Sequence, residues 1–566
     1  MFFPRPTPVP GGRTPPNPRI LLQAITAISA AVGAAIFALS PSPVAADVIP
    51  TAPAVPAAAV APAAGAAAAA IYEVAAAPRA RGALDAAVFA RLAELGIEPA
   101  HGCTDAVFVR RVFLDAIGTL PTAAETREFL ADKRANKRAL LVDRLLARDE
   151  YADYWAMKWS DLLRVKAEFP VNLWPNAAQA YHRWITAALR ENKPHDAFAR
   201  ELLTGNGSNF RVGPVNFYRA AGNKEPASLA RAVALTFLGE RAEKWPAERL
   251  AGFAQFFTRI GYKATGEWKE EIVFFDPDAA SAPDAPAPRW PDGTAATLVP
   301  GEDPREAVAT WLCDAKNPWF ARVMANRVWS WLLGRGVVHE PDDFRADNPP
   351  ANPALLAVLE REFIAAKFDV KALMRVILNS QTYQLSSLAR SARPEAEANF
   401  AFYAPRRLDA EVLIDALNQI SGTTEKYTSA IPEPYTFVPD DQRAIALPDG
   451  SITSAFLENF GRPARDTGFE SERNNRFTAA QRLALLNSTL VQRKIEQGPK
   501  LQAIYRARLP ARELVETLYL TILSRPPTAE ERTLVLGRMS QSAEARTSAV
   551  DLVWALLNSA EFLHRH

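Results

Sequence analysis

Apolar residues occur as two adjacent pairs, four residues apart, at three places in the chain, and an aromatic residue follows each set at a distance of five. The sets are Leu141, Val142, Leu145 and Leu146 before Tyr151; Leu373, Met374, Ile377 and Leu378 before Tyr383; and Leu552, Val553, Leu556 and Leu557 before Phe562. Positions i, i+1, i+4 and i+5 lie on one side of a helix. We therefore expect a mainly α-helical protein, built from related helical units that the aromatic rings close against the core.

A second repeated pattern predicts a helix, a tight turn and a new helix near each end of the chain. Thr122 with Glu125 and Thr528 with Glu531 both have the spacing of a capping box, and each follows a proline. In a capping box the threonine hydroxyl accepts an N–H of the new helix and the glutamate reaches back to the cap residue. The spacing of the copies is irregular, which indicates a duplicated unit rather than a solenoid.

The first 46 residues have the pattern of an export signal. Arginines precede the first acidic residue, a mostly apolar run covers 20–39, and 44–46 form a small-residue cleavage site. The alternative is an uncleaved membrane anchor, because the apolar run approaches the ~20 residues that span a bilayer. This segment is the only contact with a membrane that the sequence predicts.

The rest of the chain divides into a linker, two helical domains and a connection. Residues 47–81 are rich in Ala and Pro and predict an extended linker. Helical patterning predicts a first domain at 82–265 and a second at 305–566. The segment 266–304 between them is rich in proline and contains an apolar run at 272–275 that predicts a short strand. Asp303 is suited to cap, and Pro304 to begin, the next helix.

Composition excludes some classes of function. The 566 residues suffice for two or three domains, and 49% of them are apolar, as in globular proteins. Lys and Arg total 65 against 63 Asp and Glu, so we expect no nucleic-acid partner. Cys103 and Cys313 lack the spacing of metal ligands and are expected to be free buried thiols, although an exported location would permit a disulfide.

The densest polar cluster lies between two predicted helices and is called the acidic loop below. It contains His339, Asp342, Asp343, Arg345, Asp347 and Asn348, together with prolines that prevent a continuous helix. Carboxylate oxygens suit a divalent cation, and two carboxyls about 5–10 Å apart would supply the acid and base of a glycoside hydrolase. The alternative is a structural loop that caps helices and pairs with basic residues. The glycine and distal glutamate of an EF-hand are missing.

The other candidate residues combine arginine, carboxylate and tryptophan side chains in three stretches. They are Asn326 and Arg327; Trp159, Asp161, Arg164 and Trp174; and Arg462, Arg465 and Glu472. An arginine held against indole rings suits a carboxylate or sulfate group, and exposed tryptophans can stack on sugar rings. The alternatives are an ion pair with the acidic loop, an aromatic core, and a salt-bridged surface.

Several phrases of the sequence resemble a known pair of domains. For the first domain they are 108–115, 121–122 and 159–164, and for the second 317–322, 326–329, 334–336, 342–345, 348–350, 378–387 and 461–463. In this order they are similar to the domains of unknown function numbered 1549 and 1553, which occur together in exported proteins of planctomycete-type bacteria. The resemblance covers about 84–566.

The resemblance implies a location and an association rather than a reaction. Such proteins are associated with extracytoplasmic breakdown of complex, often sulfated, polysaccharides. Many relatives also carry a Cys-x-x-Cys-His haem motif between the domains and a cytochrome-c-like module. The matching segment here, 238–257, has no cysteine and no histidine, so the thioether bonds of a covalent haem cannot form. We expect no bound cofactor, and a redox function is disfavoured.

The sequence therefore predicts a helical, two-domain protein of the periplasm or cell envelope. It is expected to bind polysaccharide or envelope proteins during polysaccharide degradation. The alternative is a glycan-active hydrolase or lyase, for which the candidate catalytic residues are Asp342, Asp343, Asp347 and Glu472.

Overall fold

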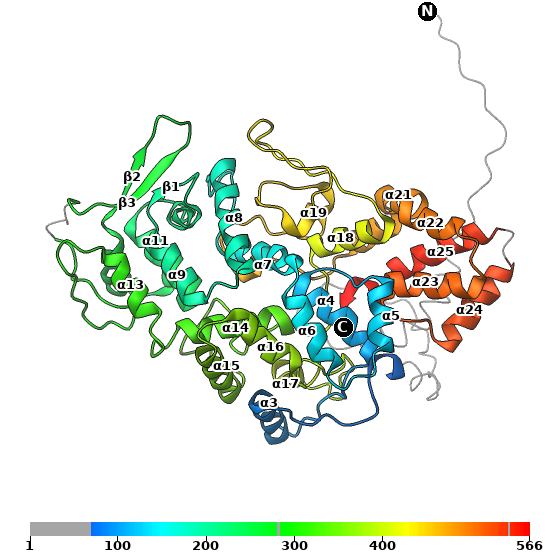
Figure 1. Cartoon of the computed structure of the whole chain (residues 1–566). Coiled ribbons are helices and arrows are strands. Elements are labelled where there is room, and N and C mark those ends of the chain that lie inside the picture. Colours follow the sequence, from blue (N-terminus) through cyan, green and yellow to red (C-terminus); the bar gives the residue numbers. More distant parts are fainter. Residues whose placement is uncertain (1–68, 280–283, 542–543) are drawn as a thin grey trace, which may run out of the picture.

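The computed structural model describes residues 69–279, 284–541 and 544–566 and is built mainly from helices (Figure 1). This confirms the predicted mainly α class. The predicted export signal and residues 47–68 of the predicted linker lie outside the described residues. None of the described helices combines the length and the apolar character needed to cross a bilayer.

In its described residues the first half of the chain contains the following α-helices, besides a helical turn at 69–72. They are α3 (Ala83–Glu94), α4 (Asp105–Ile117), α5 (Ala123–Ala131), α6 (Lys137–Leu146), α7 (Asp149–Leu162), α8 (Pro175–Arg190), α9 (His195–Thr204), α10 (Asn216–Arg219), α11 (Pro226–Val233) and α12 (Ala247–Ala254). A π-helical turn, Ala234–Leu238, extends α11. The antiparallel strands β1 (Gly207–Ser208), β2 (Ile260–Ala264) and β3 (Glu271–Phe275) follow the order β1-β3-β2, with Ile260 opposite Phe275. The strand predicted at 272–275 is confirmed.

In the described residues of the second half the regular elements are mainly helices, joined by loops, with one two-residue strand pair. Its helices are α13 (Pro304–Leu312), α14 (Phe320–Leu333), α15 (Pro353–Ala365), α16 (Val370–Asn379), α17 (Pro394–Ala398), α18 (Ala410–Ser421), α19 (Ala455–Asn459), α20 (Ala479–Asn487), α21 (Thr489–Gln497), α22 (Pro499–Arg506), α23 (Ala511–Leu523), α24 (Ala529–Gln541), α25 (Ala545–Leu557) and α26 (Ala560–Leu563). The strands β4 (Arg406–Arg407) and β5 (His564–Arg565) pair antiparallel.

Local sequence signals set the helix boundaries. The Thr122 hydroxyl accepts the N–H of Glu125 while the Glu125 carboxylate accepts the N–H of Thr122, and Thr528 and Glu531 repeat this arrangement. Both predicted capping boxes are thus confirmed. Asp303 caps α13, as expected, by accepting the N–H of Arg305.

The three repeated apolar phrases form α6, α16 and α25, and all twelve of their apolar positions are buried. The aromatic residues that follow, Tyr151, Tyr383 and Phe562, are each at most 1% exposed. The predicted role of these rings, closing the helix ends against the core, is confirmed. Both cysteines are free, Cys103 buried and Cys313 partly buried.

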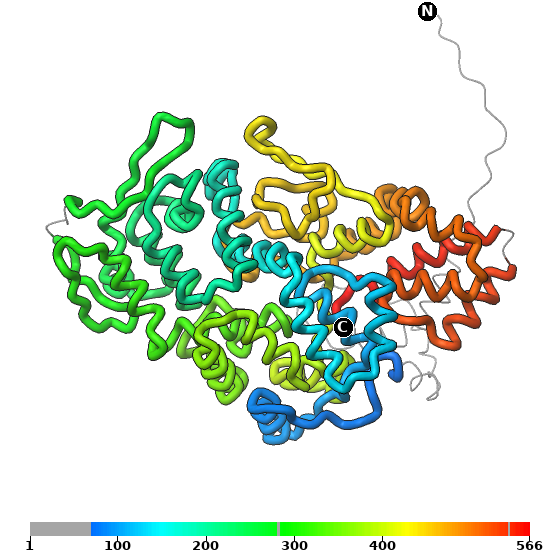
Figure 2. The backbone as a smooth tube through the Cα atoms, viewed as in Figure 1, coloured from blue at the N-terminus to red at the C-terminus, as the bar shows by residue number. Residues whose placement is uncertain are grey.

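The helix α4 and the C-terminal strand β5 lie side by side in the middle of the molecule (Figure 2). In α4, the Arg110 guanidinium donates to the carbonyls of Ile522 (2.8 Å) and Phe562 (2.9 Å). Arg111 donates to the backbone oxygens of His566, Tyr383 and Leu385 at 2.6–2.8 Å. Arg111 and Asp115 have the i,i+4 spacing of an intrahelical ion pair, but no such pair forms in α4. Arg111 makes its hydrogen bonds with the carbonyls of distant segments instead, and Asp115 pairs with Arg406 and Arg565.

The N- and C-terminal helical regions consequently share one core. α5 packs against α23 and α4 against β5, and a continuous cluster of buried apolar residues runs through both predicted domains. Separating the two regions would expose the carbonyl-binding arginines of α4.

We predict that Arg565→Ala lowers the free energy of unfolding by about 3–5 kcal/mol, because two buried carboxylates, Asp115 and Asp409, lose their shared partner. Urea unfolding followed by circular dichroism measures this. The matched control is Arg91→Ala, which removes an exposed i,i+3 pair with Glu94 and should cost under about 0.5 kcal/mol. Equal effects of the two substitutions would contradict a central role for Arg565.

Candidate functional site

A buried chain of ion pairs joins the two halves of the protein. The Asp161 carboxylate, on α7, accepts from Arg465 (2.9 Å) and Arg473 (2.7 Å). Arg473 also pairs with Glu411 of α18 at 2.8 Å, and Arg462 approaches the same carboxylate at 3.5 Å. Of the predicted site residues, the structure thus brings together Asp161, Arg462 and Arg465.

The chain of ion pairs continues to the C-terminal strand. Asp409, which precedes α18, pairs with Arg565 (2.7 Å) and Lys158 (3.2 Å). Burial alone would raise the pKa of Asp409, but Lys158, Arg565 and Arg473 outweigh it and hold that pKa well below its usual range. Arg565 then pairs with Asp115 at 3.0 Å. We call this whole chain of ion pairs, from Arg465 to Asp115, the central ion-pair network.

The acidic loop is tied to α14 and to the backbone at Glu470 by its buried residue Asp342. Asp342 is fully buried, and its carboxylate accepts from Arg327 of α14 (3.0 Å) and from the backbone N–H of Glu470 (2.6 Å). The Arg327 guanidinium also donates hydrogen bonds to the carbonyl oxygens of Leu235 and Thr236. The arrangement matches the interpretation of Arg327 as the ion-pair partner of this loop.

The other residues of the acidic loop contact partners nearer the surface. Asp343 pairs with Arg345 (3.0 Å) and Lys244 (3.4 Å), and the Asn348 amide donates to the Asp343 carbonyl. The exposed side chain of Asp347 pairs with Arg345. His339 is partly exposed beside Glu340. The described residues contain no group of three or more His, Cys, Asp or Glu side chains that could hold a metal ion, so the loop does not form a cation site of that size.

Two more of the predicted site residues, Asn326 and Glu472, form hydrogen bonds with the backbone. The Asn326 amide exchanges two hydrogen bonds with the backbone of Val338, which fixes the start of the acidic loop. The Glu472 carboxylate accepts the backbone N–H groups of Asp466 and Thr467. These bonds give Asn326 and Glu472 structural roles.

A small cavity lies between α7 and the 463–473 segment. Lys158, Asp161, Glu470 and Arg473 line it. Burial lowers the pKa of Lys158, and burial raises the pKa of Glu470, whose carboxylate accepts the indole N–H of Trp331. Such opposed shifts are typical of acid–base pairs in enzymes, but the cavity is about 10 Å³, room for a single water molecule and not for a sugar ring.

The predicted aromatic candidates separate in space. Trp159 is 2% exposed and packs against Phe198, His195 and Trp331, so it belongs to the core. Arg164 lies under Gly468, where burial lowers its pKa. Trp174 is instead partly exposed, immediately before α8.

Trp174 belongs to a group of aromatic side chains that sequence reasoning did not bring together. Its ring meets Tyr435 edge to face, with centroids 5.2 Å apart, and the Lys269 ammonium lies 6.0 Å from the Trp174 centroid. Around this pair the aromatic residues are strongly exposed: Phe169 by 82%, Trp268 by 67%, Phe437 by 67% and Tyr435 by 49%. We call these five residues the aromatic face.

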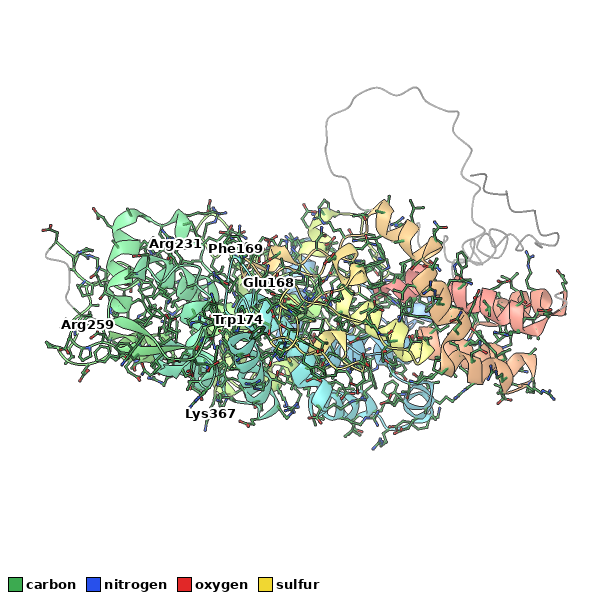
Figure 3. The ribbon with its side chains drawn as sticks, turned by 90° about the horizontal axis from the view of Figure 1, so that it is seen from above. Glu168, Phe169, Trp174, Arg231, Arg259 and Lys367 are labelled. Carbon is green, nitrogen blue, oxygen red and sulfur yellow. The ribbon has the colours of Figure 1, made fainter. Side chains whose placement is uncertain are left out.

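Three loops carry the aromatic face. Figure 1 shows the β2–β3 hairpin and the loop between α18 and α19 on either side of α8, and Figure 3 shows Phe169 and Trp174 close together. Trp174 has φ 74° and ψ 147°, a conformation that costs a bulky residue of order 1–3 kcal/mol. Its N–H donates to the Ala167 carbonyl, which holds the Phe169 loop beside it. Strain that the surrounding structure maintains on a surface aromatic is typical of binding sites.

The sequence contains an indication that these aromatic residues lie in loops, because each is next to or near a proline or glycine. Phe169 precedes Pro170, Tyr435 follows Pro434, and Trp268 lies two residues after Gly266. Only the fold shows that the three loops share one surface.

Comparison with family models identifies both halves of the chain. Residues 83–247 match PSCyt2, Protein of unknown function (DUF1549), and residues 304–538 match PSD1, Protein of unknown function (DUF1553). The chain therefore belongs to the proteins that pair these two domains. Comparison with curated proteins and with solved structures gave no match.

We predict that Asp342→Asn lowers the free energy of unfolding by about 3 kcal/mol, because the buried Arg327 loses its charged partner. Asp347→Asn is the matched control in the same loop and should change stability by less than about 0.5 kcal/mol, since that side chain is 74% exposed. Urea titration of both variants measures the difference. An unchanged midpoint for Asp342→Asn would contradict the structural role.

The protein should also lose stability in mild acid because of His195. Burial lowers the pKa of His195 from 6.5 to about 3, with Arg327 adding to the effect, and the ring stacks on Phe320 at 4.8 Å. The unfolded chain then binds a proton that the folded chain does not, so this contribution is complete above pH 6.5 and is lost as pH falls towards 3. We predict that His195→Phe reduces the loss of stability between pH 7 and pH 5 by about 2 kcal/mol.

Thermal melts across this pH range test the role of His195. The control is His101→Phe, at a partly exposed position, which should leave the acid sensitivity as in the wild type. A His195→Phe variant with an unaltered pH profile would contradict the assignment.

Proposed function

We propose that this protein is an exported cell-envelope protein that binds polysaccharide through the aromatic face, in company with polysaccharide-degrading enzymes. The ligand chain would lie across Trp174 and Tyr435, with Phe169, Trp268 and Phe437 extending the contact. The single observation that carries the proposal is the group of exposed aromatic side chains around the strained Trp174.

The chemistry of these side chains supports a sugar ligand. Sugar rings present apolar C–H faces edged by hydroxyls, and Trp and Tyr combine a broad apolar ring with a polar N–H or O–H. Lys269, close to both Trp174 and Trp268, adds hydrogen-bond donors at the edge of the same surface. Aromatic rings also lose little conformational entropy on binding, since they have two side-chain torsions.

The state of the carboxylates supports binding over hydrolysis. Asp342 and Glu472, two of the predicted catalytic candidates, accept buried or backbone donors, and Asp343 and Asp347 share Arg345. The cavity beside Glu470 has room for a single water molecule. A glycoside hydrolase would need two free carboxyls flanking a groove.

The export signal and the absence of a haem motif in the sequence support the location and the non-redox part of the proposal. The segment that matches the haem-bearing position of relatives, 238–257, includes the 3-10 turn Ala242–Lys244 and α12. It contains no cysteine, so none of its side chains can form a thioether bond.

We predict that Trp174→Ala weakens retention on insoluble polysaccharides about two- to tenfold, the equivalent of about 0.5–1.5 kcal/mol for one lost aromatic contact. Pull-down with cellulose, chitin and agarose, with depletion of the soluble protein as the readout, measures this. Trp174→Phe should retain most of the binding because the ring face remains.

The matched control is Val376→Ala, which removes an exposed apolar side chain from α16, an element packed against α6, α14 and α15. It should leave retention unchanged. Equal retention of Trp174→Ala and wild type, with correct folding, would overturn the proposal. Release of reducing ends during incubation would favour the hydrolase alternative.

A further inference from the structure

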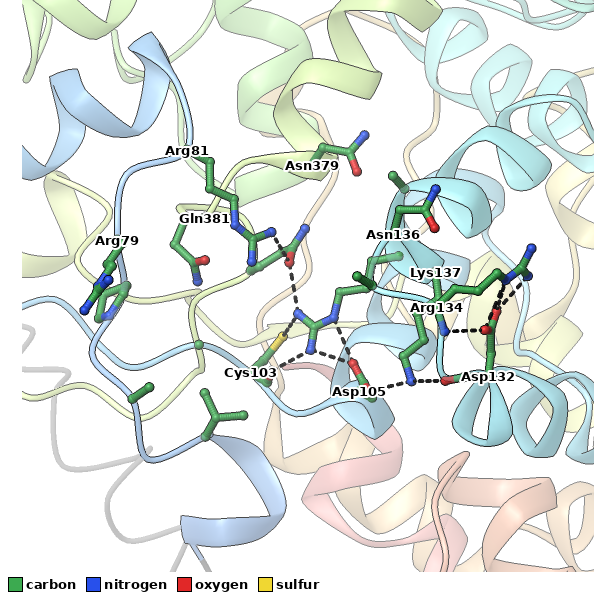
Figure 4. A pocket seen from close by; sticks show the side chains of 18 of the residues that line it. Arg79, Arg81, Cys103, Asp105, Asp132, Arg134, Asn136, Lys137, Asn379 and Gln381 are labelled. Atoms are coloured by element: carbon green, nitrogen blue, oxygen red, sulfur yellow. Dashed lines mark hydrogen bonds and ion pairs between the residues drawn. The ribbon is translucent and has the colours of Figure 1, made fainter.

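A second surface of the protein is a groove of about 1150 Å³ on the side of the molecule where α4, α5 and α6 meet the chain before α3. One wall is the extended segment 74–81, and the other is formed by the loop between α5 and α6 and by the first turn of α6 (Figure 4). The groove exceeds the volume of most small-molecule sites, so it can hold an extended ligand.

The groove concentrates positive charge in a protein whose total charge is nearly balanced. Six cationic side chains line it against two carboxylates: Arg79, Arg81, Lys133, Arg134, Lys137 and Arg138 against Asp105 and Asp132. Asp132 forms an ion pair with Arg134 at 2.7 Å, and Asp105 forms ion pairs with both Lys137 (2.7 Å) and Arg138 (2.8 Å). The whole chain carries a net charge of only +2, so this excess is local.

Three of the six cations have no carboxylate partner in the described part of the chain. Arg79 and Lys133 are exposed and make no hydrogen bond or ion pair there, and Arg81 reaches only the Gln384 side-chain oxygen at 3.5 Å. Most other cations near this surface are committed to a partner, as Arg138 is to Asp105, Gln384 and the Cys103 carbonyl. The uncommitted charges therefore face the groove together.

The start of α6 adds backbone donors to the same wall. Asn136 precedes the helix with φ −100° and ψ 15°, and its side chain accepts no N–H from the first turn. That turn contains Lys137 and Arg138 and no acidic residue, although cations are unfavourable at the positive end of a helix dipole by about 0.3–1 kcal/mol. The neighbouring helices α4 and α5, in contrast, are capped by Thr104 and Thr122.

We propose that this groove binds a ligand with several oxyanionic groups, sulfate or phosphate esters, whose oxygens occupy the first turn of α6 between Arg79 and Lys133. Arginine guanidinium groups match tetrahedral oxyanions with paired hydrogen bonds, and free N–H groups at a helix start bind the same chemistry. The ligand would supply the negative charge that the local sequence lacks. The proposal is independent of the aromatic face.

Calorimetric titration of the full chain tests the groove with four probes. Inorganic sulfate and tripolyphosphate are small, dextran sulfate is a polymer, and neutral dextran is the uncharged reference. We expect saturable binding of tripolyphosphate, dextran sulfate or both, with affinity about tenfold weaker when salt rises from roughly 50 to 200 mM. Preference for tripolyphosphate would assign a small ligand, and preference for dextran sulfate a polymeric one.

The decisive variant is Lys133→Ser combined with Arg79→Ser, which removes the two groove cations whose side chains make no hydrogen bond or ion pair in the described residues. Binding should weaken about tenfold, while Lys133→Arg should bind as the wild type. The matched control is Lys316→Ser combined with Arg512→Ser, two exposed cations without side-chain partners in the described residues and outside the groove.

The proposal is overturned if no charged probe binds saturably, or if the groove variant binds as tightly as the wild type. It is also overturned if the control variant loses as much affinity as the groove variant, because that would indicate a nonspecific charge effect. Failure of Trp174→Ala to affect polysaccharide retention would leave the groove untouched, since the two experiments use different surfaces.

Discussion

The ion pairs that Asp115 and Asp409 make with Arg565 are the constraint on which the rest of the structure depends. Asp115 comes from α4, Asp409 from the start of α18 and Arg565 from β5, three segments separated by hundreds of residues. A buried carboxylate without a cation is strongly destabilising. The stable burial of α4 therefore depends in part on the C-terminal strand β5, which supplies Arg565 to both carboxylates.

This constraint explains why so many polar residues of the sequence turned out to be internal. Asp161, Arg327, Asp342 and Arg465 are charged, yet each is satisfied by another segment of the same protein. A chemical group that is committed in this way is unavailable to a substrate. Side chains without an internal partner are the better indicators of function, and they are the exposed rings of the aromatic face and the unpaired cations of the groove between the 74–81 segment and the start of α6.

The sequence predicted local structure well because local structure depends on neighbouring residues. The capping boxes at Thr122 and Thr528, the strand at 272–275 and the buried stripe of α16 all follow from spacings of two to five residues. The partner of Arg111 could not be predicted this way. Asp115 lies one helical turn away and fits the i,i+4 rule. The Arg111 guanidinium instead donates hydrogen bonds to the backbone oxygens of residues 383, 385 and 566, which the fold buries beside it.

The acidic loop and the basic groove, the name used here for the groove lined by Arg79, Arg81 and 133–138, differ in whether folding neutralises their charges. Density of charge in the sequence pointed to the acidic loop, where opposite charges alternate and neutralise one another once folded, as Arg345 does between Asp343 and Asp347. The basic groove has less charge per residue of sequence, but its walls come from segments with the same sign, 79–81 and 133–138, so folding adds the charges instead of cancelling them. Trp174 and Tyr435 likewise can be recognised as parts of one surface only when the fold places their loops together. In a chain this rich in internal ion pairs, what the folded protein leaves unpaired is a more direct guide to its ligands than what the sequence concentrates.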